Sequence, residues 1–161
     1  MRSFSSLALA AARSKAAVVV VLQPAGTPTQ YLHRARQFRR ATMQMADYVN
    51  GEQFWPKYAL LIHSIELALK AFVNYSAPSG IPSGKEPKQH DLLGWYKLAV
   101  DYGLSRDSGI EENVDYLNEL HRIHYMRYPQ HSSKPLPDLS VIADATTDNL
   151  LDQIALVTNP P

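Results

Sequence analysis

The segment from residue 57 to residue 75 constrains this chain most, because it is apolar over most of a helical circumference. At about 100° per residue, two apolar stripes run along such a helix. The first consists of Tyr58, Leu61, Ile62, Ile65, Leu69 and Phe72, and the second, nearly opposite, of Leu60, Leu67 and Ala71. Both apolar stripes must be shielded from water by other parts of the protein or by a partner. We therefore expect a central helix packed against sibling helices and, through its second face, against another copy of the chain.

One polar stripe interrupts this central helix. His63, Glu66 and Lys70 lie between the two apolar faces. Their spacings of three and four residues allow Glu66 to pair with either neighbour. Such a stripe is either a structural network that satisfies helix contacts or part of a polar pocket.

Length and composition narrow the class of protein. The 161 residues suffice for one hydrophobic core, and no apolar run approaches the roughly twenty residues of an ordinary membrane span. The chain has no cysteine, which excludes disulfides and thiolate metal sites and suits a cytoplasmic location. Every charged residue before Asp47 is basic, although the net charge is only +1. Attraction to nucleic acid would therefore come from a local patch.

Residues 1–26 are rich in Ala, Ser and Arg and lack acidic residues. As a secretory signal, the apolar stretch AAVVVVL is short, and Arg13 and Lys15 interrupt the apolar residues before it. The composition also fits an organelle transit peptide. We interpret this segment as a disordered or non-native N-terminal extension and assign residues 27–161 to one helical domain.

Helical periodicity dominates after Pro28. Thr27-Pro28-Thr29 is a start signal for a first helix. Its inward stripe is Tyr31, Ala35, Phe38, Thr42, Met45 and Val49. After the central helix, a loop rich in proline and glycine ends at Asp91, which is placed to cap a third helix that Gly103 terminates.

A fourth helix is predicted to open at Ser108 or Gly109 and to stop at Pro129. Residues 141–157 form the last helix, and no segment of the domain reads as a strand. The inward stripe of this last helix is Ile142, Leu150, Ile154 and Val157. The predicted fold is an all-α bundle of four to five mostly antiparallel helices.

The first helix also concentrates positive charge, in Arg34, Arg36, Arg39 and Arg40. A phosphate-binding surface would use such a cluster. A solvated helix face accounts for the same pattern, since no exposed aromatic residues alternate with the arginines for base stacking.

Three segments in this order resemble the HEPN domain, a family of helical nucleotide-binding domains shared by higher eukaryotes and prokaryotes. They are YALLIHSIELALKAFV at 58–73, KQHDLLGWYKLA at 88–99 and YMRYP at 125–129, the last of which is similar to the Arg-Tyr-Pro branch of the family. The resemblance implies a helical bundle that is commonly dimeric. It also implies RNA chemistry, because many members are RNase toxins paired with antitoxins and others bind nucleotides or RNA without cutting.

The resemblance implies Arg127 and His131 as catalytic residues, because active members carry an Arg followed, after four to six residues, by a His. Here only residues 128–130 lie between the two. Metal-free RNA cleavage needs a base, an acid and a cation, which His131, His124 and Arg127 could supply. The short spacing predicts binding without efficient catalysis.

Other candidate residues have structural alternatives. Arg127 could simply pair with Glu66 or Asp91, and His90-Asp91 could be a helix cap. His121 and His124 lie three apart on one helix face, but no third ligand has an obvious spacing, so we expect no metal and no cofactor. The predicted binding residues are His63, Glu66, Lys70, His90, Asp91, His124 and Tyr128.

The favoured hypothesis is therefore a HEPN-like domain that forms a homodimer and binds RNA or a nucleotide without efficient catalysis, with no membrane as partner. The first alternative is a metal-independent RNase toxin that uses Arg127 and His131 and is held by a separate antitoxin protein. The second alternative is a structural or adaptor bundle.

Overall fold

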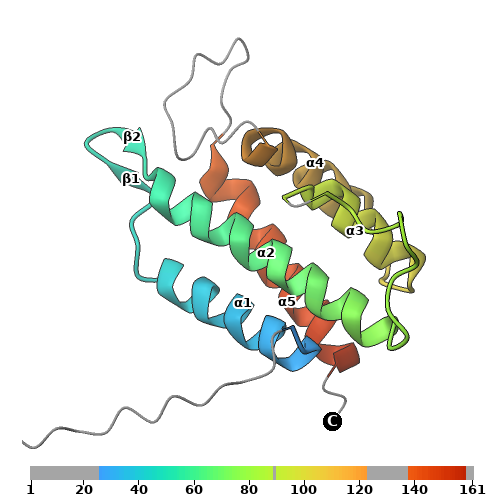
Figure 1. The fold of residues 1–161 in the computed structure, drawn as a ribbon. Coiled ribbons are helices and arrows are strands. Elements are labelled where there is room, and N and C mark those ends of the chain that lie inside the picture. Colours follow the sequence, from blue (N-terminus) through green and yellow to red (C-terminus); the bar gives the residue numbers. More distant parts are fainter. Residues whose placement is uncertain (1–25, 89, 123–137, 159–161) are drawn as a thin grey trace, which may run out of the picture.

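The computed structural model describes residues 26–88, 90–122 and 138–158. Within these ranges the chain folds into an all-α bundle, as predicted (Figure 1). Its helices are α1 (Pro28–Thr42), α2 (Trp55–Ser76), α3 (Leu92–Asp101), α4 (Ser108–Arg122) and α5 (Leu139–Thr158). No helix in the described ranges combines the length and the apolar character needed to cross a membrane.

Helix α2 lies at the centre of the bundle and contacts all four other helices (Figure 1). Its first apolar face is buried, with Leu61 and Ile65 fully inaccessible. Its second face is largely covered too, because Leu67 is only 7% exposed and Ala71 is inaccessible. Leu60, the third residue of this face, stays partly exposed, so the chain itself covers most of the second face but not all of it. Homodimerisation itself stays a prediction.

Helix α1 begins where the sequence predicted. The Thr27 hydroxyl accepts a hydrogen bond from the Gln30 N–H, and the Gln30 side chain accepts one from the Thr27 N–H. This reciprocal capping box, followed by Pro28, satisfies N–H groups that a helix start otherwise leaves free. The helix packs closely on α2, where the Ser64 hydroxyl donates to the Ala35 carbonyl over 2.7 Å.

The end of α1 was predicted wrongly. The helix stops at Thr42, so Met45 and Val49 do not continue its inward stripe. Two short antiparallel strands follow, β1 (Tyr48–Val49) and β2 (Glu52–Gln53). Between them Asn50 and Gly51 have φ values of 53° and 82°. Positive φ at both central residues is the requirement of a tight hairpin turn, which Asn-Gly meets at little cost.

Helix α3 confirms the predicted cap. The Asp91 carboxylate accepts the Gly94 N–H over 3.0 Å. A Cβ at Gly94 would lie 2.5 Å from an Asp91 carboxylate oxygen, so any other residue here would force the Asp91 cap to shift. Gly103, with φ of 103°, follows the helix end as expected.

Helices α4 and α5 complete the core. In α4 the predicted inward residues Ile110, Val114 and Leu117 are buried, and the predicted stop at Pro129 lies outside the described residues. In α5 the prediction for Val157 is wrong. It is 43% exposed because it lies in the last turn of the helix.

Candidate functional site

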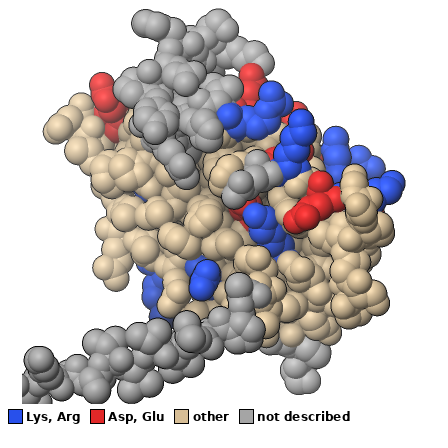
Figure 2. Space-filling view, in the orientation of Figure 1, with Lys and Arg blue, Asp and Glu red and all other residues tan. Residues whose placement is uncertain are grey.

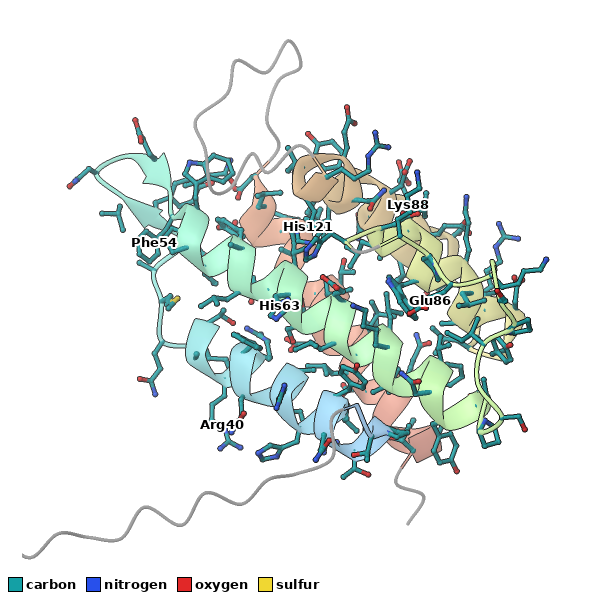
Figure 3. The ribbon with its side chains drawn as sticks, in the orientation of Figure 1. Arg40, Phe54, His63, Glu86, Lys88 and His121 are labelled. Atoms are coloured by element: carbon teal, nitrogen blue, oxygen red, sulfur yellow. The ribbon has the colours of Figure 1, made fainter. Side chains whose placement is uncertain are left out.

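The centre of the candidate site is Glu66, a carboxylate on α2 that is 2% exposed. One oxygen, Oε1, accepts a hydrogen bond from Lys70 Nζ over 2.6 Å. The other, Oε2, lies 3.2 Å from His90 Nδ1, 3.4 Å from His121 Nε2 and 3.8 Å from His63 Nδ1. We call these five residues the Glu66 cluster. Figure 3 labels two of them, His63 on α2 and His121 on α4.

Three different elements bring the cluster together. Helix α2 supplies Glu66, His63 and Lys70, α4 supplies His121, and the loop before α3 supplies His90. The His90 backbone has a φ of 68°, a left-handed conformation that costs a non-glycine residue about 1–2 kcal/mol. In this position its ring meets that of His121 edge to face, with centroids 5.2 Å apart.

Electrostatics keep Glu66 charged. Burial alone would raise the pKa of Glu66, because desolvation disfavours a carboxylate. The neighbouring His121, His63 and Lys70 outweigh that effect and hold the pKa well below its usual range. The Lys70 ammonium also lies 5.1 Å from the centre of the Trp95 ring, in a cation–π contact.

The structure brings together part of the predicted set. His63, Glu66, Lys70 and His90 meet in one cluster, and the predicted pairing of Glu66 with Lys70 or His63 is seen with both. Asp91 acts as a helix cap. Four further candidates, Arg127, His131, His124 and Tyr128, lie outside the described residues.

His121 is the member of the cluster that sequence reasoning placed elsewhere. It was considered only with His124, on the same helix, and its contact with Glu66 spans 55 residues of sequence. The one signal was the position of His121 at the end of the otherwise apolar inward face of α4. Because its partners come from α2 and from the loop before α3, spacing along α4 could not reveal them.

A second polar cluster lies nearer the start of α2. Lys57, 5% exposed, donates to Asp47 over 2.6 Å and to Asp144 over 2.9 Å. Arg39 of α1 binds Asp144 over 2.6 Å and donates two hydrogen bonds to Asp148. We call these five residues the Lys57 cluster. Burial would lower the pKa of Lys57, but its two carboxylate partners raise it.

The other arginines of α1 differ from Arg39. Arg34, Arg36 and Arg40 are exposed, and none of them forms an ion pair with a described residue. Figure 3 shows Arg40 pointing away from the bundle. Helix α1 itself contains no acidic residue, so these charges have no counter-charge on their own helix. Figure 2 shows basic side chains on this side of the molecule in separate groups, over α1 and toward α3 and α4.

Comparison of the chain with protein-family models, curated proteins and solved structures finds no match. The HEPN resemblance therefore rests on the three sequence segments alone.

Proposed function

We propose that this chain is a HEPN-like helical domain that binds RNA through its phosphate groups. The observation that carries the proposal is the solvent-exposed half of α1, where Arg36 and Arg40 lie on one flank and Arg34 on the other, and none of the three forms an ion pair with any described residue. The resemblance to a family that acts on RNA supports RNA as the ligand.

The chemistry of arginine suits this role. Its guanidinium is permanently charged, and its planar fork of N–H donors matches the oxygens of a phosphate. Arg36 and Arg40 are four residues apart, so they project from the same side of α1 about 6 Å apart along its axis. Arg39 is the internal contrast, because each of its three guanidinium nitrogens already donates to Asp144 or Asp148.

The same surface predicts little sequence preference. Base recognition in single strands commonly uses aromatic platforms. The two aromatic residues of α1, Tyr31 and Phe38, pack against the hydrophobic core. In the Glu66 cluster, the Lys70 charge is matched by the Glu66 carboxylate. Affinity should therefore come from the α1 arginines and depend on salt.

Fluorescence anisotropy with a labelled single-stranded RNA at several salt concentrations tests the proposal. Three phosphate contacts predict that the logarithm of the binding constant falls against the logarithm of salt with a slope of about −2. The double variant Arg36→Gln/Arg40→Gln should bind at least about fivefold more weakly and reduce the slope to about −0.7, because one contact remains.

Arg106→Gln is the matched control. Arg106 precedes α4 and is also exposed, but it is paired with Glu111 in the first turn of that helix. Its loss should leave RNA affinity and slope unchanged. Equal affinity and equal slope in the double variant and the wild type would refute phosphate binding by α1.

The same mixtures report on the RNase alternative. Gel analysis after incubation without added metal should show intact RNA if binding occurs without efficient catalysis. Cleavage that disappears in both Arg127→Ala and His131→Ala would establish the toxin-like activity instead.

A further inference from the structure

We propose that Glu66, His90 and His121 form a binding site for a divalent transition-metal ion of the Zn²⁺ type. This site is separate from the arginine surface of α1. It rests on geometry and donor chemistry and does not depend on RNA binding.

The distances fit a common coordination sphere. In a tetrahedral site with bonds of about 2.0 Å, neighbouring ligand atoms lie about 3.3 Å apart. Glu66 Oε2 is 3.2 Å from His90 Nδ1 and 3.4 Å from His121 Nε2. All three ligand atoms lie within 4.8 Å of one another. A small movement of the two rings would place one ion at bonding distance from all three atoms.

The donor set selects the kind of ion. Two imidazole nitrogens and one carboxylate oxygen suit Zn²⁺, Co²⁺ or Ni²⁺, whereas Mg²⁺ and Ca²⁺ prefer oxygen ligands throughout. Three protein ligands leave a fourth position for water, the arrangement of an open zinc site. His63, which is 39% exposed at its side chain, lies at the solvent side of the cluster and is not part of the three-ligand set.

The surrounding structure holds the ligands in place. Lys70 binds Oε1 of Glu66, which orients the carboxylate and leaves Oε2 toward the two rings. His90 is held in its left-handed conformation next to the Asp91 cap. The Lys70 ammonium also repels a cation, so we expect an affinity in the micromolar range, below that of a closed structural zinc site.

Calorimetric titration of the metal-stripped full chain with Zn²⁺ near neutral pH tests the inference. We expect one equivalent to bind. His90→Ala and His121→Ala should each weaken binding about tenfold or more. His33→Ala is the matched control, because His33 is exposed on α1, and it should bind Zn²⁺ like the wild type.

Titration with Co²⁺ gives a second readout that needs no variant. A four-coordinate site of nitrogen and oxygen ligands gives visible absorption that is much stronger and lies at longer wavelength than the weak band of octahedral Co²⁺ in water. If one of the variants fails to fold, the Co²⁺ absorption of the wild type still shows whether a four-coordinate metal site exists.

Two results would overturn the inference: no Zn²⁺ binding by the folded wild type at ~100 µM, or binding that survives both His90→Ala and His121→Ala. The RNA proposal fails separately, since Arg36→Gln/Arg40→Gln should leave Zn²⁺ binding intact.

Discussion

The two polar clusters along α2 have opposite charge arrangements. In the Glu66 cluster a single carboxylate is surrounded by one ammonium and three imidazoles. In the Lys57 cluster two permanent cations share three carboxylates. The first therefore depends on one central acid, whereas the second is a chain in which Asp144 links Lys57 to Arg39.

The two clusters use buried charge in different ways. In the Lys57 cluster every charged group has a fixed partner, and the network joins the segment before β1, α1, α2 and α5. In the Glu66 cluster the imidazoles outnumber the carboxylate oxygens available to them, because Lys70 already occupies Oε1. The imidazole nitrogens gathered around Oε2 of Glu66 are potential metal ligands, and the Lys57 cluster has no imidazole.

Replacement of Glu66 should have the largest effect on stability. Glu66→Gln removes the negative charge and one of the two acceptor oxygens, so Lys70 and the three rings are left with a single neutral carbonyl oxygen, and we expect a loss of about 3 kcal/mol in the free energy of unfolding. Urea denaturation measures it. Glu112→Gln, an exposed control on α4, should change stability by no more than about 0.5 kcal/mol. Equal losses in the two variants would show that Glu66 is not the centre of its cluster.

Replacement of Lys57 should have an intermediate effect. Lys57→Met leaves Asp47 and Asp144 without their shared cation, but both keep some contact with water and Asp144 keeps Arg39. We expect a loss of about 2 kcal/mol by the same urea measurement, below the usual range for a fully buried pair. Lys97→Met, at an exposed lysine of α3, serves as control. A cost above that of Glu66→Gln would reverse the order of the two clusters.

Replacement of Asp148 should matter least. Its side chain is 53% exposed, and Arg39 retains Asp144 when Asp148 is neutralised. Asp148→Asn should cost about 0.5 kcal/mol, as for an exposed ion pair. Asp152→Asn on the same helix is the control. If thermal melts show that Asp148→Asn loses as much stability as Lys57→Met, then the remaining Arg39–Asp144 pair does not compensate for the loss of Asp148.

The helical bundle was predictable because each helix carries its own evidence. Apolar residues at spacings of three and four define the inward stripes, and Thr27 and Asp91 mark helix starts by local hydrogen bonding. The hairpin was missed because strands of two residues are too short to show alternation. The exposed Val157 was missed because periodicity does not report where the neighbouring helices end.

The candidate site was predictable only within one helix. The pairing of Glu66 with Lys70 follows from their spacing of four residues. The contacts with His90 and His121 depend on how α2, α4 and the loop pack, which no local pattern encodes. The burial of Lys57 was missed for the same reason, because its partner Asp144 lies 87 residues further along the chain.

The order of the two clusters along the sequence has a consequence for synthesis. All members of the Glu66 cluster lie between His63 and His121, whereas the Lys57 cluster needs Asp144 and Asp148 of α5. A chain made from its N-terminus therefore has every group of the Glu66 cluster before α5 exists. On the ribosome Lys57 first has Asp47 as its only acidic partner from this network, and the emergence of α5 completes the ion pairs.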